Sequence, residues 1–271
     1  MALELNEQTV PFKEFYGANY KQMPLLISGK NEKGKVVDIP RIPLSYEGLM
    51  KRKLQVLNAS QEIQDAWYTN YFDTGDGVAT DRAGNIKIEY DSPTMRSLNP
   101  ESKLKSGALV LADDAFEKIQ GHEFTSKDIA KYKFNESLSE SEVNEHPFWM
   151  VLAREDKALL KEYAHQIFKK AKETHGYDKN MGVYLSSFRE VPNMRLWLSN
   201  RLDNDSNASG LNFLVNYIGR LVGVAPEAQS ALDKSSIIIP ALDDIIKISS
   251  PYVAEINRDA LTKDLTANLY K

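Results

Sequence analysis

The feature that most constrains the fold is a change in hydrophobic period along the chain. Around residue 88, Ile86, Ile88 and Tyr90 alternate with charged residues, which is typical of a strand with one buried face. Within residues 155–177 the apolar residues recur every three or four positions, which is typical of an amphipathic helix. Because the two patterns occupy separate regions of the chain, the sequence predicts an α+β protein.

The two regions suggest a division of the chain into two parts. We expect a strand-rich N-terminal part, residues 1–135, packed with a mainly helical C-terminal part, residues 136–271. The boundary is placed in the polar, Ser- and Glu-rich stretch KYKFNESLSESEVNEH, where the composition changes. A chain of 271 residues is long enough for two modest domains or for one compact domain, so both arrangements stay open.

The N-terminal part contains two predicted hairpins separated by a helical stretch. Residues 24–40 place apolar runs around a Gly-, Asn- and Lys-rich turn, which favours a hairpin. Residues 45–72 carry apolar residues at helical spacing. Residues 77–91 form the clearest hairpin, with the turn DRAGN between its strands.

The C-terminal part contains several helix signals. Ser139 and Glu142 have the spacing of a capping box, and Pro147 suits the first turn of a further helix. In residues 155–177 the apolar stripe predicts that Ile167 and Phe168 are buried core. A short strand is expected at residues 181–188, and further helices are expected at residues 193–202, 210–224, 240–250 and 250–270.

The composition limits the possible function classes. The chain has 34 Lys and Arg against 38 Asp and Glu, so its net charge of −4 disfavours broad binding to nucleic acids or to anionic membranes. It has no cysteine, which excludes disulfides, thiol catalysis and cysteine-based metal sites. The N-terminal stretch does not resemble a signal peptide and no apolar run is long enough to span a bilayer, so we expect a soluble cytoplasmic protein.

The stretch RLDNDSNASG, residues 201–210, most resembles a metal site. Asp203, Asp205 and Asn207 occupy alternate positions, as the first ligands of a calcium loop do. An EF-hand is excluded because Ala208 and Leu214 stand where glycine and a bidentate glutamate are required. A looser calcium site and a solvated loop between two helices remain as alternatives, and we expect no calcium binding at physiological affinity.

Two further groups of residues are functional candidates. Asp73 and Asp76, in the acidic stretch DTGDGVATD, and His146 are the candidates for a metal-assisted or acid/base hydrolase. The same acidic stretch also suits a simple connection between a helix and a hairpin, and His146 also suits a helix cap. A nucleic-acid-binding protein would use Lys51, Arg52 and Lys53, next to the N-terminal aromatic residues.

The preferred functional hypothesis is an intracellular protein that acts by binding, as a structural or interaction component. The chain shows no nucleophile elbow, HExxH or GxGxxG motif, and it has only four histidines. We therefore expect a protein partner or a homo-oligomer, with no cofactor, no membrane and no favoured nucleic acid. The hydrolase and the nucleic-acid-binding protein stay as alternatives, and the sequence leaves open whether the protein is an enzyme.

Overall fold

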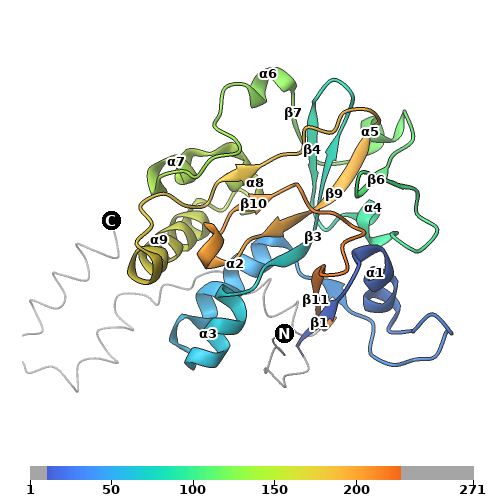
Figure 1. Cartoon of the computed structure of the whole chain (residues 1–271), viewed down its shortest axis with the longest axis horizontal. Helices are drawn as coiled ribbons and strands as arrows, with labels where there is room; N and C mark the ends of the chain where they lie inside the picture. Colours follow the sequence, from blue (N-terminus) through green and yellow to red (C-terminus); the bar gives the residue numbers. More distant parts are fainter. Residues whose placement is uncertain (1–10, 227–271) are drawn as a thin grey trace, which may run out of the picture. The chain divides into compact units, whose positions relative to one another are not determined.

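One long strand, β3 (Phe72–Thr80), runs through the middle of a mixed sheet in the computed structural model, which describes residues 11–226. β3 pairs antiparallel with β4 (Ile86–Glu89) and β9 (Asn193–Ser199), and parallel with β11 (Arg220–Val224). β1 (Phe12–Tyr16) pairs antiparallel with β11, which brings the two ends of the described chain side by side (Figure 1).

Short elements complete the described part of the chain. The remaining strands are β2 (Ile42–Pro43), β5 (Leu104–Lys105), β6 (Ala108–Val110), β7 (His122–Phe124), β8 (Val183–Tyr184) and β10 (Ala208–Ser209). The α-helices are α1 (Asn19–Ser28), α2 (Tyr46–Gln55), α3 (Gln61–Tyr68), α4 (Pro93–Arg96), α5 (Ala115–Lys118), α6 (Ser126–Ile129), α7 (Glu140–Glu145), α8 (Pro147–Leu152) and α9 (Lys157–His175). Two 3₁₀ helices, η1 (Val56–Asn58) and η2 (Leu202–Asn204), lie at loop positions.

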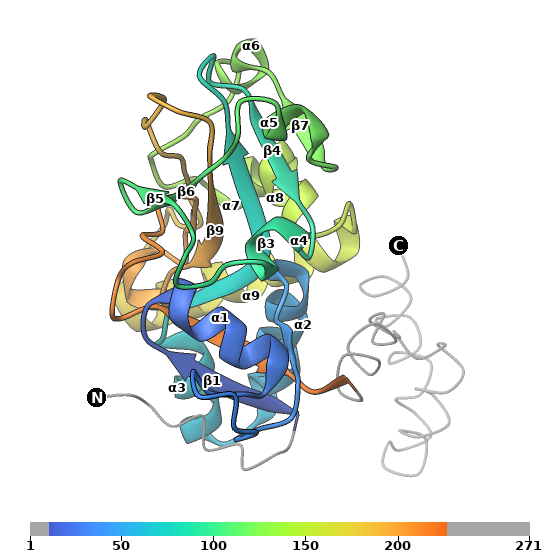
Figure 2. The ribbon, with the colours of Figure 1, turned by 90° about the vertical axis from the view of Figure 1, so that its right-hand side faces the viewer.

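Helices cover both faces of the sheet, so the described residues form two hydrophobic cores. The larger core packs α2, α8 and α9 against one face, and the smaller core packs α1, α4 and α5 against the other. Figure 2 shows α1 on the near side of β3 and α9 on the far side. Burial on both faces explains why all nine residues of β3 are buried.

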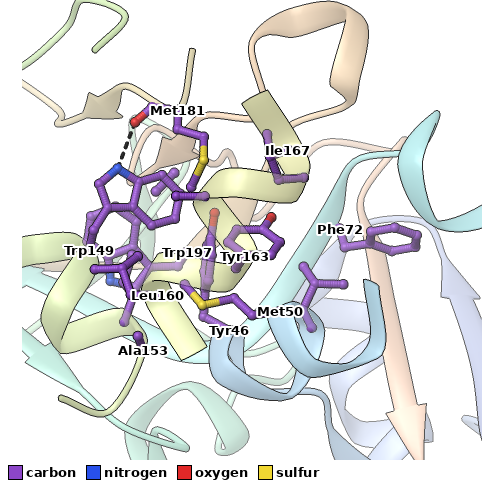
Figure 3. Close-up of a cluster of buried hydrophobic side chains, with 14 of the residues drawn as sticks. Tyr46, Met50, Phe72, Trp149, Ala153, Leu160, Tyr163, Ile167, Met181 and Trp197 are labelled. Carbon is purple, nitrogen blue, oxygen red and sulfur yellow. Dashed lines mark hydrogen bonds between the residues drawn. The ribbon is translucent and has the colours of Figure 1, made fainter. Parts of the chain in front are cut away.

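The larger core contains several large aromatic side chains (Figure 3). Trp149 of α8 and Trp197 of β9 are completely buried there, next to Leu160 and Tyr163 of α9. The indole Nε1 of Trp149 donates a hydrogen bond of 2.7 Å to the main-chain oxygen of Met181, so this buried polar group has a partner. The core combines residues from both sides of residue 135, so the two parts expected from the sequence share it.

Several sequence predictions are confirmed. The structure is α+β, with a hairpin of β3 and β4 whose turn is closed by a 2.8 Å hydrogen bond from the Asn85 amide to Asp81 Oδ1. Ser139 and Glu142 form the capping box of α7, and Pro147 opens α8. Ile167 and Phe168 are buried, as the apolar stripe of α9 predicts.

Three local predictions are wrong. Residues 24–40 do not form a hairpin of strands, because residues up to Ser28 belong to α1 and only one bridge, between Lys30 and Val36, follows. Residues 193–202 contain strand β9, and residues 210–224 contain a loop followed by β11, where helices were expected. A strand buried on both faces has a continuous apolar run, which period alone does not separate from a helix. The helices predicted at residues 240–250 and 250–270 lie outside the described residues.

Candidate binding surface

The hydrolase candidates occupy three separate environments. Asp73 accepts hydrogen bonds from Asn19, Asn212 and the Arg220 amide. Asp76 accepts hydrogen bonds from the amides of Tyr46 and Asp91, and pairs with Arg154. His146 is buried, and its Nε2 lies 3.0 Å from the Lys133 oxygen.

The surroundings of these groups are those of structural side chains. Phe134, Phe148 and Tyr132 rings surround His146, and burial lowers the pKa of its imidazole. Each aspartate is nearly or completely buried, and each joins distant segments. Asp76 accepts from two main-chain amides, whereas Asp73 accepts from one main-chain amide and two asparagine side chains. The structure does not bring the three residues into one site, and the hydrolase stays a prediction from sequence.

The candidate nucleic-acid residues do not share an exposed face. They are consecutive on α2, so their side chains point in three directions about 100° apart. Lys51 pairs with Glu47 at 2.9 Å, and the Arg52 guanidinium lies over the rings of Phe12 and Trp67. Lys53 is completely buried, and its Nζ donates to Ser199 Oγ at 3.2 Å.

Lys53 and Ser199 belong to a buried polar cluster inside the larger core. A serine beside a lysine of lowered pKa has the groups of nucleophilic catalysis, and burial does lower the pKa of Lys53, to about 7. Both side chains are completely buried, however, so no substrate reaches them in this structure. We treat the pair as part of the core.

The acidic stretch RLDNDSNASG is tied to other parts of the chain. Asp203 pairs with Arg201 at 3.0 Å, and Asp205 Oδ2 accepts a 2.8 Å hydrogen bond from Ser137. Asn207 is buried, and its Oδ1 accepts a 2.6 Å hydrogen bond from the Gly182 amide. Within residues 11–226, no group of three or more His, Asp or Glu side chains is arranged to hold a metal ion.

The expected position of this stretch between two helices is wrong. It follows β9 and contains η2 and the strand β10, which pairs with both β8 and β9. Sheet pairing on both sides of Ala208 explains why the end of the stretch is buried although its sequence is polar.

A row of exposed apolar side chains follows this stretch, just before β11. Leu211, Phe213, Val215 and Tyr217, here called the apolar strip, are exposed by 38%, 53%, 48% and 80%. Asn212 and Leu214, which lie between them, are buried. This segment has no regular secondary structure, yet its side chains alternate: the four large apolar ones are exposed to solvent, and Asn212 and Leu214 point into the protein.

The loop that carries the apolar strip, residues 210–219, is held by its main chain. The Leu214 amide donates to the Gly107 oxygen at 2.8 Å, and Arg195 Nη1 donates to the Asn212 oxygen at 2.6 Å. The hydroxyl of Tyr71 donates to the Ile218 oxygen. None of these bonds uses a side chain of the strip, so the shape of the loop is set independently of the side chains that it exposes.

A hollow of about 210 Å³ lies beside the apolar strip. Leu211 and Phe213 line it together with Tyr71, Asn200 and Asp73. Next to it the Arg195 guanidinium lies 5.2 Å from the centre of the Phe213 ring, a cation–π contact that supports this exposed side chain from below.

Comparison with known proteins gives one informative likeness. No protein-family model matches the chain, and no curated protein matches it. A solved structure described by the words "Accommodation of massive sequence variation in Nanoarchaeota by the C-type lectin fold" matches 82% of this chain and 100% of its own, with a TM-score of 0.56. The likeness shows a C-type lectin fold. With 16% of residues identical, it concerns the fold alone.

Sequence reasoning missed the apolar strip. Apolar residues occupy positions 211, 213, 215 and 217, but Leu214 lies between them and interrupts the alternation, and the run was interpreted as a helix. What exposes the strip is contact with Gly107, Arg195 and Tyr71, which are distant in the sequence.

Within the described residues, none of the helices combines the length and the apolar character needed to cross a bilayer.

Proposed function

We propose that this protein acts by binding a protein partner through the apolar strip. The observation that carries the proposal is the exposure of Leu211, Phe213, Val215 and Tyr217 in one short loop. Water-exposed apolar side chains that gather in one place mark interaction sites, and aromatic residues are enriched at the centres of protein interfaces. The main chain next to Tyr16, whose side chain is 44% exposed, is bonded to the end of the loop, because the Gly17 amide donates to the Gly219 oxygen.

The anchored main chain of the loop supports the proposal. A loop that is already held in its bound shape loses less conformational entropy when a partner binds, so more of its contact energy appears as affinity. Hydrogen bonds to Arg195, Gly107 and Tyr71 hold the loop before any partner arrives.

The size of the adjacent hollow favours a protein over a small molecule. Its volume of about 210 Å³ is below the roughly 300–1,000 Å³ that is usual for small-molecule sites. The hollow is suited to accept one side chain of a partner whose surface covers the strip. Phe213, which is 53% exposed, lines this hollow, and an exposed aromatic side chain beside a small hollow is typical of an interface centre.

The structural likeness is consistent with this proposal. In the similar protein, the C-type lectin fold is described as accommodating massive sequence variation. In the present chain the loop is held by main-chain contacts, so the strip side chains can be exchanged without loss of the fold. A surface of this kind can be adapted to a partner while the scaffold stays constant.

The experiment compares two double variants with the wild-type chain. Phe213→Ser with Tyr217→Ser removes the aromatic part of the strip. Val36→Ser with Val37→Ser is the matched control, because these valines are 66% and 50% exposed but lie in the loop after α1. Each protein is used to capture binding proteins from an extract of the source cells. A protein recovered by the wild type is then purified and titrated against all three.

We expect the partner to bind the wild type and the valine variant with equal affinity. Its affinity for the strip variant should be at least tenfold lower. A captured partner that binds all three proteins equally would show that the strip is not its binding site. Sedimentation of the wild type alone adds a further outcome, since dimerisation lost in the strip variant would make a second copy of the chain the partner.

A further inference from the structure

The carboxylate of Asp73 joins four segments of the fold beneath the apolar strip. Its Oδ1 accepts a 2.6 Å hydrogen bond from the side chain of Asn212, in the loop that carries the strip. Its Oδ2 accepts hydrogen bonds from the Arg220 amide at 2.7 Å and from Asn19 Nδ2 at 3.0 Å. One side chain of β3 therefore fixes the middle of the loop, the start of β11 and the first residue of α1.

This carboxylate is buried without an ion pair of its own. Asp73 is 2% exposed. The nearest cation is Arg220, but its Nε pairs with Glu14 Oε1 at 2.8 Å, and its guanidinium lies 5.5 Å from the rings of Tyr16 and of Tyr71. The ionisable groups that act on Asp73 are Arg220 of β11 and Tyr71, just before β3. Glu14 and Tyr16 of β1 lie around the same Arg220. The loop presents Asn212 and α1 presents Asn19, which are both neutral.

The side chain of Asn19 can also provide an acceptor for a protonated Asp73 carboxyl. Its side chain is completely buried, and its Oδ1 has no hydrogen-bond partner among the described residues. Turning the amide over replaces the donor that faces Asp73 Oδ2 with this acceptor. A proton on Asp73 then has an oxygen to bond to, while the NH2 group of Asn19 takes the place of that oxygen and gives up its bond to Asp73.

We propose that Asp73 is a positioning residue whose protonation tightens the loop bearing the apolar strip and whose ionisation loosens it. The proposal deepens the proposed function, because it makes the order of the binding surface depend on pH. Its physical basis is the cost of an ionised carboxylate that is buried and shares the cation Arg220 with Glu14. Opening the loop lets water reach the carboxylate and relieves that cost.

The direction of the pH dependence follows from burial. Desolvation raises the pKa of Asp73 from 3.8 to about 6, against the lowering effect of its hydrogen bonds and of Arg220. An opened loop returns the carboxyl to its ordinary pKa, so the closed loop binds the proton more tightly. The stabilisation of the closed loop is therefore complete in acid below pH 3.8 and is lost as the pH rises through about 6.

Amide hydrogen exchange in the full chain tests this proposal without any partner. The reporters are the amides of Leu214, Gly219 and Arg220, which are hydrogen-bonded within or beside the loop. After correction for the intrinsic exchange rate, the opening constant should rise about tenfold between pH 5 and pH 7.5, as a shift of about two pKa units requires. Amides of α9 that exchange only by global unfolding should stay far better protected than the loop at both pH values, which would show that the loop opens locally.

Two variants separate the proposal from a general role in folding. Asp73→Asn is neutral at every pH, so its loop should not titrate, and at pH 7.5 it should be at least as well protected as the wild-type loop is at pH 5. Asp81→Asn is the matched control, since this carboxylate lies beyond the other end of β3 and bonds only within its own turn. It should keep the wild-type titration.

The opposite sign would overturn the proposal. If protection of the loop falls in acid, or if Asp73→Asn leaves the loop less protected at every pH, the ionised carboxylate is the stabilising form. Should Asp73→Asn fail to fold, the wild-type titration decides alone. Glu14→Gln adds a check, because freeing Arg220 to face Asp73 should move the midpoint to lower pH. A loop that titrates as expected while strip variants keep full partner affinity would refute the proposed function and leave this inference standing.

Discussion

Lys53 Nζ lies 3.2 Å from Ser199 Oγ, and both side chains are completely buried between α2 and β9. Burial lowers the pKa of Lys53 from 10.5 to about 7. Between these two values the unfolded chain binds the proton that the folded chain releases, so the free energy of unfolding should rise with pH. We expect a gain of about 2 kcal/mol between pH 7.5 and pH 9.5 in urea unfolding.

The matching variant is Lys53→Met, which keeps the length of the side chain and removes the amine. It should be at least as stable as the wild type at pH 7.5, and it should lose most of the rise toward pH 9.5, since no buried amine remains to be protonated. Equal pH slopes in the two proteins would show that Lys53 is charged in the folded state.

A second prediction concerns the buried ion pair of Asp76 and Arg154, whose atoms Oδ1 and Nη2 lie 2.8 Å apart. Arg154→Leu leaves a completely buried carboxylate without its cation, which should lower the free energy of unfolding by about 3–5 kcal/mol. Arg82→Leu is the control, because its pair with Asp113 is exposed to solvent and should contribute under about 1 kcal/mol. Similar losses in both variants, measured by urea unfolding, would contradict this account.

A third prediction concerns α9, the helix that the sequence pattern predicted most clearly. Phe168 lies on the buried side of α9, and Phe168→Ala should reduce the free energy of unfolding by about 3–5 kcal/mol through lost burial and a cavity. Lys169→Ala is the neighbouring control on the exposed side of α9, and it should change stability by under about 0.5 kcal/mol. A loss below about 1 kcal/mol for Phe168→Ala would mean that the surrounding side chains close the cavity.

Sequence patterns predicted the elements whose signals are local. The turn of the β3–β4 hairpin, the capping box of Ser139 and Glu142, and the stripe of α9 each depend on residues that are near neighbours in the chain. Their hydrogen bonds join residues only a few positions apart, so the spacing in the sequence already indicates them. These elements could therefore be recognised without a structure.

The elements that were missed depend on tertiary contacts. β9 is covered on both faces, with Trp197 in the larger core and Leu196 in the smaller one, so its apolar run does not alternate. In α1, the apolar run that follows Pro24 was interpreted as a strand, yet Met23 and Leu26 are completely buried on a helix, and this packing outweighs the local pattern.

The candidate site was the least predictable part. Asp73 was proposed as a hydrolase candidate, but its partners Asn19, Asn212 and Arg220 come from distant segments, so its place in the fold could not be deduced from spacing. Exposure of the apolar strip is likewise a property of the fold, because it follows from the anchoring of the loop by Arg195 and Gly107.

A fourth prediction tests how the strip is supported. Gly107 has φ of +75°, and a Cβ placed on it would overlap the ring of Phe213. Gly107→Ala should therefore destabilise the fold by about 1–3 kcal/mol and displace Phe213. Gly34→Ala is the control, since Gly34 has a similar φ of +73° but no atom near its Cβ position. If both variants lose the same stability, backbone strain explains the effect and Phe213 does not contribute.

The central claim is that the apolar strip is a binding surface that the fold does not need for its own stability. One paired measurement on Tyr217→Ser tests it most directly: the free energy of unfolding and the dissociation constant for the captured partner, beside the control Val36→Ser. The account predicts that both variants unfold within about 0.5 kcal/mol of the wild type, because both side chains are exposed. Only Tyr217→Ser should bind more weakly, by tenfold or more. Unchanged affinity, or a loss of stability that accounts for the weaker binding, would contradict it.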